Sequence, residues 1–103
     1  MNLETVILYS SQVTVDELHQ LVFKGEYAAK HLIYVFDLGV VHAEDSALFL
    51  TVAKALNKQK LSFVLVSTAL TYENVQEGIG FCPTIEEAHD LIELETIQRD
   101  LEE

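Results

Sequence analysis

The stretch His31–Leu56, HLIYVFDLGVVHAEDSALFLTVAKAL, joins an apolar run, an acidic loop and an amphipathic segment. Its first part, Leu32–Leu38, is almost continuously apolar, which is typical of a strand covered on both faces. From Ser46 to Asn57 the apolar residues recur at three- and four-residue spacing, which predicts a helix with one buried face. We therefore expect a buried strand, a loop and a helix that begins at Asp45-Ser46.

The rest of the chain continues the alternation of strands and helices. Strands are expected at Thr5–Ser10 and Leu61–Val66, with a brief edge strand at Phe81-Cys82. Three further helices are expected: one from the capping box Thr14/Glu17 to Gly25, a short one at Thr71–Glu77, and a last one after the capping box Thr84/Glu87. The inward face of the last helix is predicted to hold Ile85, Ala88, Leu91, Ile92, Ile97 and Leu101.

This order, β-α-β-α-β-α-(β)-α, indicates an α/β fold. Strands separated by helices are typical of a mostly parallel sheet that is flanked by helices. The sequence contains no internal repeat, low-complexity segment or linker, so residues 1–103 are expected to form a single small domain.

The composition narrows the classes of partner. The net charge is −11, and from Glu73 onward ten acidic residues stand against a single arginine, Arg99, and no lysine. Nucleic acids and anionic lipid surfaces require cationic side chains, so neither is expected as a partner. No apolar run is long enough to span a bilayer, and the first residues lack the basic region of a signal peptide. With Cys82 as the only cysteine, the sequence predicts a cytoplasmic protein without disulfides.

No group of residues predicts catalysis. The four histidines lie on separate predicted elements, without the spacing of a metal site, and Ser46 has no base or nucleophile elbow beside it. Glycine-rich phosphate-binding motifs are absent. We therefore expect a protein that is not an enzyme and binds no metal and no cofactor.

One family fits the central stretch. Asp37-Leu38 and Asp45-Ser46, with Val41 between them, resemble the signature of STAS domains, the anti-sigma-factor antagonist family. The segment Pro83–Ala88 also looks like the turn into the last STAS helix. The resemblance extends over roughly Thr5–Leu101, although the chain lacks the first strand of that family and has Ala47 and Leu48 where the family has serine and glycine.

The resemblance implies a module for protein–protein interaction in bacterial signalling. In the family, a partner kinase phosphorylates the serine after the loop aspartate, which makes Ser46 the candidate phosphorylation site; the alternative role for Ser46 is a helix cap. A phosphate there would sit at the favourable end of the helix dipole and would repel a partner docked beside Glu44 and Asp45. The predicted partner-binding residues are Asp37, His42, Glu44, Asp45, Ser46 and Phe49.

Several kinds of partner are compatible with the predicted docking surface. A serine kinase, an anti-sigma factor or another basic protein fits the docking surface, and the alternative function is a STAS-like domain that binds a nucleotide or lipid near the same helix start. The missing first strand would leave a sheet edge unpaired, which predicts a homo-oligomer or a partner bound along that edge.

Overall fold

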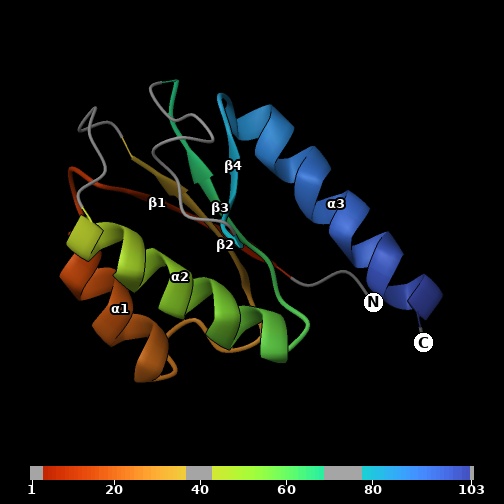
Figure 1. Cartoon of the computed structure of the whole chain (residues 1–103), viewed down its shortest axis with the longest axis horizontal. Coiled ribbons are helices and arrows are strands. Elements are labelled where there is room, and N and C mark those ends of the chain that lie inside the picture. The colour runs from red at the N-terminus through yellow and green to blue at the C-terminus, as the bar shows by residue number, and fades with distance from the viewer. Residues whose placement is uncertain (1–3, 37–42, 69–77, 103) are drawn as a thin grey trace.

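A sheet of four parallel strands, in the order β1-β2-β3-β4, forms the centre of the molecule (Figure 1). The computed structural model describes residues 4–36, 43–68 and 78–102. Its elements are β1 Thr5–Tyr9, α1 Val15–Phe23, β2 His31–Val35, α2 Ala43–Lys58, β3 Phe63–Val66, β4 Gly80–Cys82 and α3 Ile85–Glu102. This confirms the predicted α/β fold, with Phe81-Cys82 in an edge strand; the predicted helix Thr71–Glu77 lies outside the described residues.

The helices form two layers around the sheet (Figure 1). Right-handed crossovers that step the same way along a sheet place their helices on the same face. Accordingly α1 and α2 pack together on one face, whereas α3 returns over the other. Among the described elements, α1 and α2 therefore cover one side of the sheet and α3 covers the other.

Alternation along the strands divides the core in two. In β2, Leu32 and Tyr34 point toward α1 and α2, whereas Ile33 points toward α3. In β3, Leu65 points toward α1 and α2, whereas Val64 points toward α3. These strands are apolar on both sides because each side carries a helical layer, as the unbroken apolar runs predicted.

Local signals define both ends of α1. Glu17 N–H donates to Thr14 Oγ1 at 3.2 Å, and Glu17 Oε1 accepts from Thr14 N–H, which confirms the predicted capping box. At the other end Gly25 has a φ of 81°. Its N–H donates to the Val22 carbonyl, and Glu26 N–H donates to the Leu21 carbonyl, the paired bonds of a Schellman motif. The predicted stop at Gly25 is therefore confirmed.

Two expectations about helices were wrong. Helix α2 begins at Ala43 rather than at Asp45-Ser46, because Ala43 and Glu44 favour helical geometry and the acids suit the positive end of the dipole. Ile97 and Leu101 of α3, predicted to face inward, are exposed. Between them Arg99 turns toward the sheet, where it donates to the carbonyls of Lys60 and Leu61.

Candidate functional site

A cleft of about 200 Å³ opens at the carboxyl ends of β1 and β2, beside the starts of α1 and α2. It is lined by Ser10, Thr14, Val15, Asp16, Tyr34 and Asp45. Parallel strands deliver their carboxyl ends, and the helix starts that follow, to the same edge of the sheet. The fold therefore brings Asp16 next to a cleft shared with Asp45, although 28 residues separate them in the chain.

Backbone and hydroxyl contacts fix the wall of this cleft. The Tyr34 hydroxyl donates to the Val13 carbonyl at 2.6 Å and so ties β2 to the segment that enters α1. Ser10, which is buried, follows β1 directly, and its N–H donates to the Val35 carbonyl at 2.9 Å. The cleft is thus a pre-formed feature of the sheet edge.

The charge of the cleft is negative. Asp16 and Asp45 come from the first turns of different helices, and Glu17 and Glu44 stand beside them. Thr14 Oγ1, the capping oxygen of α1, already accepts from Glu17 N–H. Two carboxylates at one cleft attract a cationic group and repel phosphate. Within the described part of the chain, no three histidine, cysteine or acidic side chains group as metal ligands.

The predicted site residues divide into three groups. Glu44, Asp45 and Ser46 lie together in the first turn of α2, with Glu44 exposed and the other two half-buried. Asp37 and His42 lie outside the described residues. Phe49 is buried, with no exposed surface, so its prediction as a partner contact is corrected. It lies one turn after Asp45 on the side of α2 that packs on the sheet, because helical periodicity turns it inward.

Sequence reasoning missed the half of the cleft that α1 supplies. The signal was present, since the capping box Thr14/Glu17 places Asp16 in a first turn directly after a strand. Joining it to Asp45 required that both helices start at the same edge of a parallel sheet. The common edge of the two helix starts follows from the predicted parallel topology.

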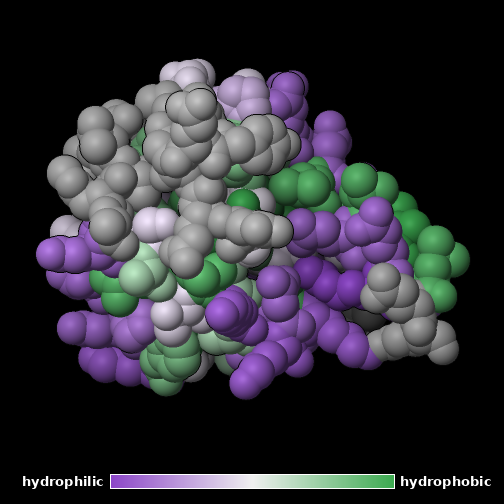
Figure 2. Space-filling model, viewed as in Figure 1, coloured by the Kyte–Doolittle hydropathy of each residue, from purple (hydrophilic) through white to green (hydrophobic). Residues whose placement is uncertain are grey.

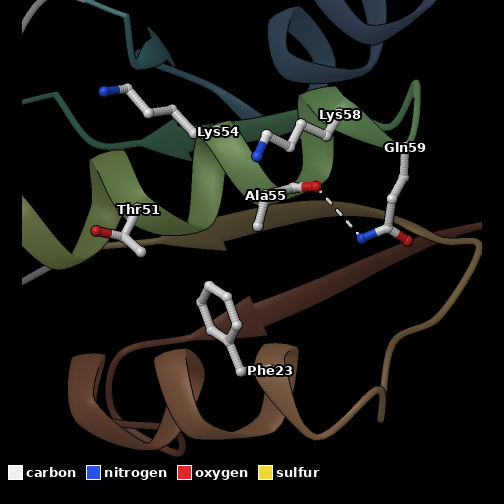
Figure 3. A pocket seen from close by; sticks show the side chains of 6 residues that line it. All are labelled: Phe23, Thr51, Lys54, Ala55, Lys58 and Gln59. Atoms are coloured by element: carbon white, nitrogen blue, oxygen red, sulfur yellow. Dashed lines mark hydrogen bonds between the residues drawn. The ribbon is translucent and has the colours of Figure 1, made fainter.

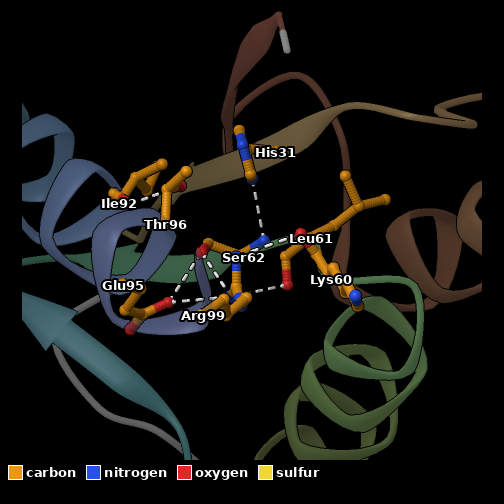
Figure 4. Close-up of polar contacts among 8 residues, drawn as sticks. All are labelled: His31, Lys60, Leu61, Ser62, Ile92, Glu95, Thr96 and Arg99. Atoms are coloured by element: carbon orange, nitrogen blue, oxygen red, sulfur yellow. Dashed lines mark hydrogen bonds and ion pairs between the residues drawn. The ribbon is translucent and has the colours of Figure 1, made fainter. Parts of the chain in front are cut away.

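A partly buried polar cluster joins α3 to the amino ends of β2 and β3 (Figure 4). The Ser62 hydroxyl donates to Glu95 Oε1 at 2.6 Å, and Arg99 donates to Ser62 Oγ at 2.8 Å and to the carbonyls of Lys60 and Leu61. Ser62 N–H donates to His31 Nδ1 at 2.9 Å.

The cluster holds a serine, a histidine and an acid, but its geometry is not that of a catalytic triad. A triad requires the histidine to accept from the serine hydroxyl. Here His31 accepts from the Ser62 backbone instead, and Ser62 has no exposed surface. We therefore interpret the cluster as a structural link between α3 and the sheet.

Cys82 is a buried free thiol. Burial raises the pKa of its thiol, and the carboxylates of Glu87 and Glu95 act in the same direction. The thiolate is the nucleophilic form, so this environment disfavours cysteine chemistry.

The pKa of His31 makes stability depend on pH. Burial lowers this pKa below its ordinary value of 6.5, and Arg99 adds to the effect, partly offset by Glu95. The unfolded chain therefore binds a proton more readily than the folded one. The contribution of neutral His31 is fully present above about pH 6.5 and is lost as the pH falls toward the folded pKa.

We expect His31→Asn, which keeps an acceptor near the position of Nδ1, to remove this part of the pH dependence. Urea unfolding from about pH 7.5 to about pH 5.5 measures it, and the wild type should lose more free energy of unfolding than the variant. His89→Asn, at an exposed position of α3, is the control and should follow the wild type. Parallel profiles for wild type and His31→Asn would refute the assignment.

Comparisons with known proteins give no family for this chain: no family model matches it, and no curated protein is significantly similar to it. Within the described residues, none of the helices has the length and hydropathy needed to cross a bilayer.

Proposed function

We propose that this chain is a non-catalytic, STAS-like interaction module that docks a basic partner protein at the cleft lined by Asp16 and Asp45. The observation that carries the proposal is the meeting of Asp16 and Asp45, from two helix starts, at one cleft on the carboxyl edge of the sheet. A lysine or arginine side chain of a partner fits a narrow cleft of this charge. The cytoplasm is the compartment that this proposal assumes.

The acidic surroundings favour a protein partner over a nucleotide. A phosphate group at the cleft would approach Asp16 and Asp45, and among the described residues that line this cleft there is no lysine or arginine to offset them. The net charge of −11 adds a long-range attraction for a basic surface and raises the rate of encounter.

Ser46 is the proposed point of regulation. It is the fourth residue of α2, directly after Asp45, and its side chain is half-buried. A phosphate on this hydroxyl adds nearly two negative charges beside Glu44 and Asp45. A dianion cannot stay half-buried between like charges, so we expect the first turn of α2 to rearrange and the docked partner to be released.

The proposal predicts that partner binding depends on the charge of the cleft. Immobilised protein is used to capture partners from an extract of its native cells, and each captured protein is quantified by mass spectrometry. The relevant partner should bind Asp16→Lys and Asp45→Lys about tenfold less than wild type, which corresponds to the loss of about one charge-assisted contact. Ser46→Asp should also reduce capture, whereas Ser46→Ala should retain it.

Glu86→Lys is the matched control. Glu86 is an acid in the first turn of α3, so its reversal has the same effect on net charge and a similar one on a helix dipole, but at a different helix. Capture that falls equally in all three reversal variants indicates nonspecific attraction to an acidic protein and contradicts the proposal. Stabilisation of the wild type by nucleotides or phospholipids in a thermal-shift screen favours the ligand-binding alternative.

A further inference from the structure

Helix α3 carries apolar residues on two opposite sides. Ala88 and Ile92 are buried against the sheet. Leu94, Ile97 and Leu101, which we call the outer stripe, are exposed by 51, 49 and 80 %. At about 100° per residue, these three positions lie together on the side of the helix that faces away from the sheet. Figure 2 shows hydrophobic side chains along the right-hand edge of the molecule, where α3 runs.

Carboxylates follow one flank of the outer stripe. Glu86, Glu93 and Asp100 are spaced by seven residues, and all three are exposed. Seven residues correspond to nearly two helical turns, so these acids form a row along the helix. A surface that covers the stripe therefore needs an apolar centre and a cationic rim.

The opposite layer of the same molecule offers such a surface. A groove of about 510 Å³ lies between the ends of α1 and α2 and is lined by Phe23, Thr51, Lys54, Ala55, Lys58 and Gln59 (Figure 3). The Phe23 side chain extends toward α2 and is 55 % exposed, which makes it the apolar part of the groove.

Two cations border the groove. Lys54 and Lys58 are exposed and lie one turn apart on α2. Neither forms an ion pair with another residue in the described part of the chain. In a chain with a net charge of −11, a groove that has two such lysines and no acid among its described lining residues is a local inversion of charge.

We propose that the groove between α1 and α2, bordered by Lys54 and Lys58, receives the outer stripe of α3 from a second copy of this chain. The apolar side chains of the stripe cover Phe23 and Ala55, and the acidic row meets Lys54 and Lys58. The charges and the apolar areas of the two surfaces are complementary, whereas two stripes or two grooves facing each other would oppose like charges.

The position of the two surfaces determines the kind of assembly. The groove belongs to the layer of α1 and α2, and the stripe belongs to the layer across the sheet. Each copy therefore uses one surface to receive and the other to dock, which is a heterologous contact that extends head to tail. The cleft with Asp16 and Asp45 lies at the other end of α1 and α2 and stays outside this contact.

The contact is small, so the association is weak and depends on concentration. Three exposed apolar side chains provide much less than the area of a permanent interface. The net charge of −11 on each copy also causes long-range repulsion, which a salt concentration of about 0.15 M screens beyond roughly 8 Å.

Sedimentation velocity over a rising concentration series, in about 0.15 M salt, tests the proposal. The sedimentation coefficient of the wild type should increase with concentration. Ile97→Glu, which disables the stripe, and Phe23→Glu, which disables the groove, should each remain monomeric. Gln12→Glu adds the same charge at an exposed position outside both surfaces and should associate like the wild type. All three changes are at solvent-accessible positions, and circular dichroism confirms that the variants are folded.

Mixing the two disabled variants gives the decisive result. Ile97→Glu keeps an intact groove, and Phe23→Glu keeps an intact stripe, so their mixture should form one-to-one dimers and nothing larger. A wild type that stays monomeric overturns the proposal. If Phe23→Glu still associates and Ile97→Glu does not, the proposal is overturned and two α3 helices pair with each other. If both variants still associate, the proposal is overturned and the contact is formed by a sheet edge.

Discussion

Replacing Phe49 with alanine is expected to lower the free energy of unfolding by about 3–5 kcal/mol. Phe49 has no exposed surface and lies at the centre of an aromatic group. Its ring centroid is 5.7 Å from those of Tyr34 and Phe36 and 6.1 Å from that of Phe63. Removing the ring leaves a cavity between α2 and the sheet, and aromatic neighbours on two strands cannot close it without moving backbone.

Thermal unfolding measures this effect. A loss of that size should lower the midpoint of a domain of this length by more than about 12 °C. Phe23→Ala is the control, since its ring is 55 % exposed and its removal should cost less than about 1 kcal/mol. Similar losses in the two variants would contradict the central place assigned to Phe49, which is the residue that sequence reasoning placed on the docking surface.

The second large effect is expected at Arg99. Substitution by methionine should cost about 2–4 kcal/mol, because the carbonyls of Lys60 and Leu61 lose their donor and Glu95 loses its cation. Methionine retains the length and apolar character of the side chain, so the loss reports chiefly the polar contacts. Chemical denaturation measures the difference in the free energy of unfolding.

Lys30 provides the matched comparison for Arg99. It forms an ion pair with Glu4 at 3.6 Å, but both side chains are substantially exposed. Exposed pairs contribute about 0–1 kcal/mol, so Lys30→Met should have little effect. If Arg99→Met costs no more than Lys30→Met, the cluster with Ser62 does not hold α3 on the sheet.

The sequence predicted the parts of the fold that depend on near neighbours. The capping box of α1 and its end at Gly25 require residues no more than five positions apart, and both were predicted. The unbroken apolar runs of β2 and β3 implied two covered faces and hence a parallel sheet. Helix propensity without a strong capping signal left the start of α2 misplaced by two residues.

The parts that depend on distant partners were not predicted. Ile97 and Leu101 were expected to face inward because apolar residues usually do. Arg99 instead takes the inward direction, and its partners Lys60 and Ser62 stand 39 and 37 residues before it in the chain. No local pattern in α3 reveals that the carbonyl groups of Lys60 and Leu61 will accept hydrogen bonds at that position. The contribution of Asp16 to the cleft was missed for the same reason.

The strand order β1-β2-β3-β4 has a consequence for how the chain folds. Every strand pairs with the strand that precedes or follows it in the sequence, so the sheet can extend in the order of synthesis without waiting for a distant segment. Helix α3 is the exception, since it closes over Ile33 and Val64 only after β4 is in place. Until then no other described helix covers the apolar face of the sheet that carries these two residues. The arrival of α3 from the ribosome is therefore the event that ends the period of greatest risk of aggregation.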